Sequence, residues 1–175
     1  MLLLQHPLED EEVLATAPLL VGSLGPALTL ARGTAWRSLG DALGRSGDSA
    51  DGAAPDPSRW AVLWRAAGGG GTGAPADGDR PLDGVIALDG TWAQAKRIWG
   101  RNPWLEALPR LSLRPTEPGI YGKTRREPDR EAISTLEAVA DALQANGEDP
   151  ALRAGLRRLM RTMVQRARDT DPRKR

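Results

Sequence analysis

The stretch Gly84-Val85-Ile86-Ala87-Leu88-Asp89-Gly90-Thr91-Trp92 carries the strongest fold signal in this 175-residue chain. Its apolar first half predicts a buried strand, and the pattern that opens at Thr91 predicts a helix. Asp89 stands at the junction, and α/β proteins keep their ligands at the carboxyl ends of such strands. A simpler interpretation is that Asp89 or Thr91 only caps the helix, since both residue types accept hydrogen bonds from free amides at a helix start.

Outward from this junction, apolar runs alternate with helical patterns, which predicts an α/β fold with a largely parallel sheet of about five strands. The expected strands are 1–5, 27–30, 60–64, 84–88 and 110–114. The expected helices are 11–21, 36–43, 91–99, 133–146 and a last helix that begins at Asp149-Pro150. Within the first of these, Pro18 favours a break or a late start. We expect a single domain over 1–175.

Two tracts rich in Gly, Ala, Asp and Pro interrupt the pattern, residues 44–57 and 66–81. We expect them to be flexible surface insertions. Four consecutive glycines, Gly68 to Gly71, lie in the second tract. A phosphate-binding P-loop also needs Gly-Lys-Ser/Thr at the start of a helix, and none follows these glycines.

The composition excludes several classes of site. Cys is absent, which removes disulfides, thiolate catalysis and Cys-ligated zinc. The single histidine, His6, argues against a Ser-His-Asp triad or a site with several His ligands. No apolar run approaches the length that spans a bilayer, and no signal peptide precedes the fold. We therefore expect a cytoplasmic protein without a metal or a membrane partner.

The formal net charge of +1 hides an asymmetry along the chain. Residues 1–91 carry 6 Lys/Arg against 12 Asp/Glu, whereas residues 92–175 carry 18 against 11. Of the 24 basic residues 21 are arginine, which forks onto phosphate, although a GC-rich genome would produce the same excess. The basic half therefore favours a polyanionic partner without proving one.

The last helix combines an apolar face with many arginines. Its apolar residues at helical spacing are Leu152, Leu156, Leu159, Met160, Met163 and Val164. The arginines expected mostly off that face are Arg153, Arg157, Arg158, Arg161, Arg166 and Arg168. The pattern predicts a helix docked on the domain, and its basic side is either simply solvated or part of an RNA-facing surface.

Three stretches, taken together and in this order, resemble the DTW-domain family of tRNA-uridine aminocarboxypropyltransferases. The first is Leu4-Gln5-His6-Pro7 with Glu9 and Thr16-Ala17, and the second is Leu88-Asp89-Gly90-Thr91-Trp92 with Gln94-Ala95. The third is Tyr121 with Arg125-Arg126 ahead of Ser134-Thr135-Leu136-Glu137-Ala138. The similarity runs from Met1 to the last helix.

The resemblance implies a SPOUT-like fold with a C-terminal trefoil knot, which no pattern in the sequence would predict, because knots are very rare. It also implies S-adenosylmethionine as co-substrate and tRNA as partner. Such enzymes transfer the 3-amino-3-carboxypropyl group to N3 of a uridine and release 5′-methylthioadenosine. A monomer or a homodimer is compatible with the family.

For that reaction Asp89 is the candidate catalytic base, because the N3 proton of uridine must leave as nitrogen attacks carbon. The resemblance assigns cofactor binding to residues of all three stretches: Gln5, His6, Pro7, Thr16, Leu88, Gly90, Thr91, Trp92, Tyr121, Ile133, Ser134, Thr135 and Glu137. The candidate RNA-binding residues are Lys123, Arg125, Arg126, Arg97 and Arg101.

Several of these residues have simpler roles as well. Trp92 is either a core residue or a stacking platform for a base. Ser134 and Glu137 have the spacing of a capping box, and the same helix start could receive the carboxylate of the donor. The cluster Lys123, Arg125 and Arg126 is either an RNA or donor-carboxylate contact or a solvated loop.

The chain also departs from longer relatives, which often carry a Cys-rich segment ahead of the Gln5-His6-Pro7 strand. Two other functions remain open. A SPOUT-type RNA methyltransferase would release S-adenosylhomocysteine from a similar pocket. A non-catalytic RNA-binding protein would tolerate Asp89→Asn.

Overall fold

The computed structural model describes residues 1–11, 14–45, 54–64, 81–112, 117–121 and 133–170. Within these residues five strands form one sheet in the order β2-β1-β4-β3-β5, and every pairing is parallel. The strands are β1 (Leu2–Gln5), β2 (Thr29–Arg32), β3 (Trp60–Leu63), β4 (Gly84–Asp89) and β5 (Arg110–Leu111). The expected α/β class and parallel sheet are therefore confirmed.

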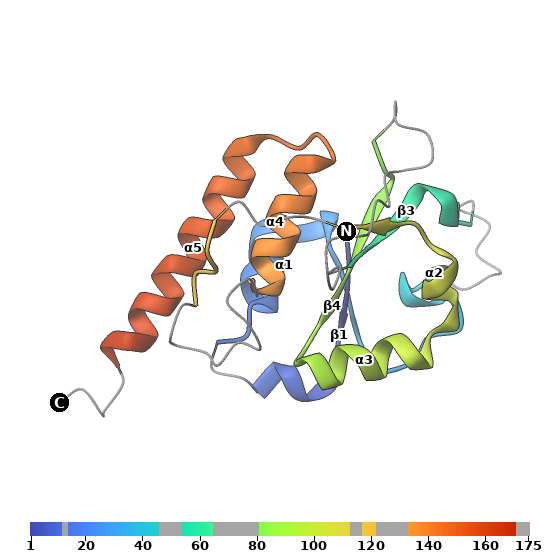
Figure 1. Ribbon diagram of the computed structural model, residues 1–175, viewed down its shortest axis with the longest axis horizontal. Helices are drawn as coiled ribbons and strands as arrows, with labels where there is room; N and C mark the ends of the chain where they lie inside the picture. The colour runs from blue at the N-terminus through green and yellow to red at the C-terminus, as the bar shows by residue number, and fades with distance from the viewer. Residues whose placement is uncertain (12–13, 46–53, 65–80, 113–116, 122–132, 171–175) are drawn as a thin grey trace.

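Helices cover both faces of the sheet (Figure 1). One face carries α1 (Ala17–Leu24), α4 (Thr135–Ala145) and α5 (Pro150–Asp169). The other carries α2 (Leu39–Ala42) and α3 (Trp92–Arg101). Short 3₁₀ helices occupy Pro7–Glu11, Gly25–Ala27, Pro57–Arg59 and Pro103–Ala107.

The alternation of side chains along β1 divides the core into two layers. Leu3 packs with Leu20 and Leu136 on the side of α1 and α4, whereas Leu2 and Leu4 pack on the side of α3. All three leucines of β1 are fully buried. Coverage on both faces explains why β1 and β4 are continuous apolar runs rather than alternating ones.

Gly84 allows the first residues of β3 and β4 to pair closely. Trp60 lies opposite Gly84 in the parallel register, and a Cβ on Gly84 would come within 2.5 Å of the Trp60 ring. The indole therefore covers the start of β4, and any side chain at position 84 would displace it.

The carboxyl ends of three neighbouring strands lie level with one another. The register pairs Gln5 of β1 with Arg32 of β2 and with Asp89 of β4. Parallel pairing thus gathers residues separated by more than 80 positions at one edge of the sheet, and this edge positions the candidate site.

Some predicted boundaries are wrong for local reasons. The strand expected at 27–30 begins at Thr29, because Gly25–Ala27 forms a 3₁₀ turn. The helix expected at 11–21 is replaced by a 3₁₀ turn and by α1, which starts late with Pro18 in its first turn. The helix expected at 36–43 is only α2, whose start is fixed by the Ser38 cap.

Other predictions lie partly or wholly outside the described residues. These include most of both expected insertions and the end of the strand expected at 110–114. Among the helices that the structure does describe, none combines the length and apolar character needed to cross a bilayer.

Candidate active site

Asp89, Gln5 and Arg32 form a hydrogen-bonded chain across the ends of β4, β1 and β2. The Nε–H of Arg32 donates to Gln5 Oε1 at 3.1 Å, and Gln5 Nε2 donates to Asp89 Oδ2 at 3.0 Å. Gln5 is fully buried and Asp89 is 2 % exposed. Because arginine can only donate, it fixes which end of the Gln5 amide faces Asp89. The carboxylate is therefore held in one orientation at the edge of the sheet.

His6 is joined to Asp89 through the backbone, and its imidazole has a nitrogen without a partner among the described residues. The backbone N–H of His6 donates to the Asp89 carbonyl at 3.0 Å, and its Nδ1 accepts from the Leu8 amide at 3.3 Å. A neutral imidazole that accepts at Nδ1 carries its proton on Nε2. Nε2 is buried and has no hydrogen-bond partner among the described residues. Buried polar atoms are normally paired, so this atom is a candidate contact for a ligand.

Gly90 permits the close approach between the β4–α3 turn and His6. Its φ of +149° lies in a region that side chains rarely adopt. A Cβ there would come within 2.9 Å of Gln94 and 3.4 Å of the His6 Cβ. The turn therefore requires glycine, and it leaves the backbone of residue 90 accessible beside the Asp89 edge.

The capping interpretation holds for Thr91 and not for Asp89. Thr91 and Gln94 form a capping box, in which Gln94 Oε1 accepts from the Thr91 amide at 2.6 Å. The Asp89 carboxylate instead accepts from Gln5. Trp92 is 48 % exposed, so the expectation of a core residue is wrong for it. An indole on the surface in the first turn of α3 remains a stacking candidate.

The remaining residues predicted near the first strand have less specific surroundings. Thr16 is buried at the start of α1, and its side chain makes no capping hydrogen bond. Leu88 is half-buried and packs into the core under α3, while Pro7 is exposed at the start of its 3₁₀ turn.

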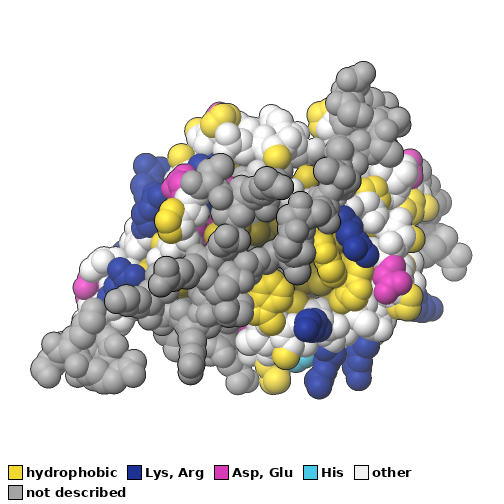
Figure 2. Space-filling view, viewed as in Figure 1, with side chains coloured by type: hydrophobic (Ala, Val, Ile, Leu, Met, Phe, Trp, Pro, Cys, Tyr) yellow, Lys and Arg dark blue, Asp and Glu magenta, His cyan; other side chains and the backbone are white. Residues whose placement is uncertain are grey.

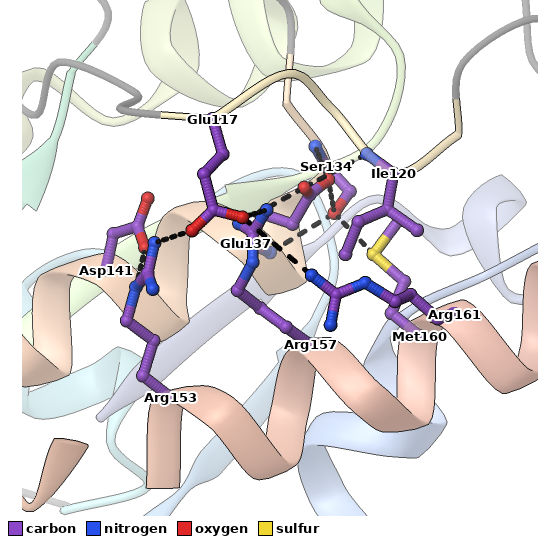
Figure 3. Close-up of polar contacts among 9 residues, drawn as sticks. All are labelled: Glu117, Ile120, Ser134, Glu137, Asp141, Arg153, Arg157, Met160 and Arg161. Atoms are coloured by element: carbon purple, nitrogen blue, oxygen red, sulfur yellow. Dashed lines mark hydrogen bonds and ion pairs between the residues drawn. The ribbon is translucent and has the colours of Figure 1, made fainter. Parts of the chain in front are cut away.

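Ser134 and Glu137 form the second capping box, and this one is buried (Figure 3). Glu137 accepts from the Ser134 amide and from Ile120 N, each at 3.1 Å. It also pairs with Arg157 of α5 at 3.3 Å. Glu137 is completely buried, so its carboxylate is engaged in joining α4, α5 and the segment at Ile120.

The arginines of α5 contribute to the same network (Figure 3). Arg157 is 3 % exposed and pairs with both Glu137 and Glu117, which corrects the expectation that it lies off the packed face. The positive charge of Arg157 lowers the pKa of Glu117 below its ordinary value, and a hydrogen bond from Arg153 lowers it further. The hydrogen bond from Arg153 to Asp141 raises the pKa of Arg153. These arginines hold α5 in place. Arg161 also pairs with Glu117, at 3.8 Å, although it is exposed, as Arg158 and Arg166 are.

Tyr121 is buried and donates its hydroxyl proton to the Leu14 carbonyl at 2.7 Å. Ile133 and Thr135 flank Ser134 and are half-buried. Arg97 and Arg101 are exposed on α3. Lys123, Arg125 and Arg126 lie outside the described residues.

Arg32 is the site residue that the sequence analysis missed. Its position at the end of a strand adjacent to β1 is the signal that could have found it, once the strand order is known. Within the part of the chain that the structure describes, no group of three or more His, Asp or Glu side chains could hold a metal ion.

Comparison with known proteins identifies the family. The model of the DTW domain matches residues 1–168. The chain belongs to the DTW-domain family. A segment of 81 residues is also 33 % identical to a protein named tRNA-uridine aminocarboxypropyltransferase 2 from Drosophila melanogaster. That segment is 46 % of this chain and spans about a third, 32 %, of the Drosophila protein. No solved structure matches the chain significantly.

Proposed function

We propose that this DTW-domain protein transfers the 3-amino-3-carboxypropyl group of S-adenosylmethionine to N3 of a uridine in tRNA. The observation that carries the proposal is the buried carboxylate of Asp89, oriented by Gln5 at the carboxyl edge of the sheet. The family match and the name of the Drosophila relative support a tRNA substrate and a transferase reaction. The activity belongs in the cytoplasm, where tRNA is available.

The chemistry of the described residues at this edge supports a donor site there. His6 Nε2 is a buried donor that has no acceptor among the described residues, and Gly90 keeps the adjacent turn free of a side chain. Gln5, His6, Gly90 and Thr91 would line the donor pocket next to Asp89. The residues at the start of α4, Ile133 to Thr135, would contribute its other wall, where free amides of a helix start suit a carboxylate.

In the proposed reaction Asp89 accepts the N3 proton of uridine. The N3 electron pair forms the new bond to the γ-carbon of the aminocarboxypropyl group. The donor supplies a sulfonium leaving group, and the carbon–sulfur bond breaks with its electron pair on sulfur to give 5′-methylthioadenosine. The protein's main contribution is to align nitrogen, carbon and sulfur, since such alignment removes a large entropic barrier. The chain Arg32–Gln5–Asp89 fixes one end of that alignment.

The finer fold assignment is part of the same proposal. We infer that the sheet belongs to a single SPOUT-like domain with a C-terminal trefoil knot. The parallel order β2-β1-β4-β3-β5 and the docking of α4 and α5 on one face are compatible with it. The segment 122–132, which leads to α4, lies outside the described residues.

The test is to mix the protein with S-adenosylmethionine and unmodified tRNA and to identify both products by mass spectrometry. We expect aminocarboxypropyl-uridine and 5′-methylthioadenosine. A methylated base with S-adenosylhomocysteine would refute the proposed group transfer and identify a methyltransferase. Binding of tRNA without any product would indicate a non-catalytic RNA-binding protein.

A further inference from the structure

An open cleft of about 480 Å³ lies between the loop that follows β2 and the carboxyl end of α3. Two indoles, Trp36 and Trp104, and two guanidiniums, Arg37 and Arg101, line it. Pockets that hold small ligands measure about 300–1,000 Å³, so the volume suffices for a nucleotide. The combination of aromatic and cationic side chains is the one that proteins use for unpaired nucleotides.

Asn102 fixes the shape of this cleft. Its side chain is fully buried and accepts from the Trp36 amide at 2.7 Å, while its Nδ2 donates to the Thr34 carbonyl at 3.0 Å. Trp104 Nε1 donates to the Trp36 carbonyl at 2.9 Å. The two aromatic walls are thus joined by hydrogen bonds before any ligand arrives, so little ordering is needed on binding.

The charges in the cleft are positioned for a phosphate and for a base. The Arg37 side chain is 93 % exposed and its Nε lies 3.7 Å from Asp41 Oδ2, while Arg101 is held by a hydrogen bond to Thr34 Oγ1 at 3.0 Å. Both guanidiniums keep several donors for phosphate oxygens. The carboxylate of Asp41 accepts from the Arg37 amide at 2.8 Å, which places an acceptor for base amino groups in the same cleft.

The cleft is connected to the Asp89 edge through β2 and α3. Its loop begins at Gly33, directly after Arg32, and the Gly33 amide donates to the Gln5 carbonyl at 3.0 Å. The face in Figure 2 shows Lys and Arg side chains over α3, where Lys96, Arg97 and Arg101 are exposed. A polyanion that follows this basic helix would therefore pass both the cleft and the Asp89 edge.

We propose that this cleft binds one nucleotide of the RNA substrate, a neighbour of the uridine that is modified. Its base lies against the indoles of Trp36 and Trp104, and its phosphate is bound by Arg37 and Arg101. This inference rests on the proposed function, because it assumes an RNA substrate. It adds a second recognition point that selects the strand conformation around the target.

The first test measures the salt dependence of binding to labelled, unmodified tRNA without donor. Each lost phosphate contact lowers the slope of log K against log salt by about one unit. We expect that decrease for Arg37→Ala and for Arg101→Ala. The matched control is Arg158→Ala, an exposed arginine of α5 on the opposite side of the sheet. An unchanged slope for Arg37→Ala, or an equal decrease for Arg158→Ala, overturns the proposal.

The second test does not depend on any variant. The wild-type protein is crosslinked by near-ultraviolet light to tRNA that contains 4-thiouridine, and the adducts are mapped by peptide mass spectrometry. We expect nucleotide adducts on the peptides that carry Trp36 or Trp104. Adducts confined to other elements refute the cleft and leave the proposed function intact. Failure of the wild-type protein to bind tRNA at all refutes the proposed function, and this inference with it.

Discussion

The substitution Asp89→Asn tests the proposed mechanism with the least change in structure. The side chains are nearly identical in shape, and the new side-chain amide would still offer an oxygen to Gln5 Nε2, which lies 3.0 Å from Asp89 Oδ2. What disappears is the charge and with it the capacity to accept the N3 proton. General base catalysis typically contributes about 10²–10⁴-fold to a rate. We therefore expect kcat to fall by about that factor.

The structural cost of the same substitution is small. A hydrogen bond to a charged group contributes about 1.5–3 kcal/mol and a neutral one about 0.5–1.5 kcal/mol, so the loss is about 1–2 kcal/mol. In a protein of this size 1 kcal/mol shifts Tm by about 2–4 °C. The variant should therefore remain folded at the assay temperature, and its affinity for S-adenosylmethionine should stay within about tenfold, or ~1.4 kcal/mol.

Single-turnover assays with excess enzyme and labelled tRNA measure the chemical step directly. The matched control is Asp83→Asn, which makes the same chemical change just before the opposite end of β4, where Asp83 pairs with Arg59 at 2.7 Å. The control should retain the wild-type rate. Normal turnover by Asp89→Asn would remove Asp89 from the mechanism, whatever the effect on stability.

Three further predictions concern stability. Arg157→Met leaves the buried Glu137 carboxylate without its counter-ion and should lower the free energy of unfolding, measured by urea titration, by about 3–5 kcal/mol. The double variant that also carries Glu137→Gln should recover most of this loss. Additive losses in the double variant would contradict a coupled pair. Gly90→Ala places a residue with a side chain at φ +149°, against Gln94, and should lower the free energy of unfolding by about 1–3 kcal/mol, measured as a lower Tm. An unchanged Tm would show that the turn relaxes. Arg157 lowers the pKa of Glu117, so the stabilisation by Glu117 is fully present above its ordinary pKa of about 4.3 and is lost as the pH falls through the lowered value. The free energy of unfolding of Glu117→Gln should therefore approach that of the wild type only in acid.

The sequence was sufficient to predict the β4–α3 junction because local signals agree there. The apolar run, the Thr91 cap and the helical pattern all indicate the same structure, and the strand and helix appear as β4 and α3. Where local signals conflicted, boundaries moved. The region 36–43 has helical spacing, yet its first residues form the loop that Asn102 holds, through a contact 66 positions away.

Arg32 could not be found from the sequence for a different reason. Its role depends on β1 lying between β2 and β4, and strand order in a parallel sheet is set by long-range pairing rather than by local pattern. The same is true of Arg157. Helical periodicity placed it among solvated arginines, but the partners that bury it, Glu117 and Glu137, come from other segments.

The two capping boxes show how far a sequence motif determines function. Thr91 with Gln94 and Ser134 with Glu137 have the same spacing and the same hydrogen bonds. The first is exposed beside the Asp89 edge, and its uncharged Gln94 needs no partner beyond the cap. The second is buried, and its charged Glu137 requires Arg157 as a counter-ion. Burial and charge therefore decide that the second box joins helices while the first stays at the surface beside the candidate site, and only the tertiary structure supplies the burial.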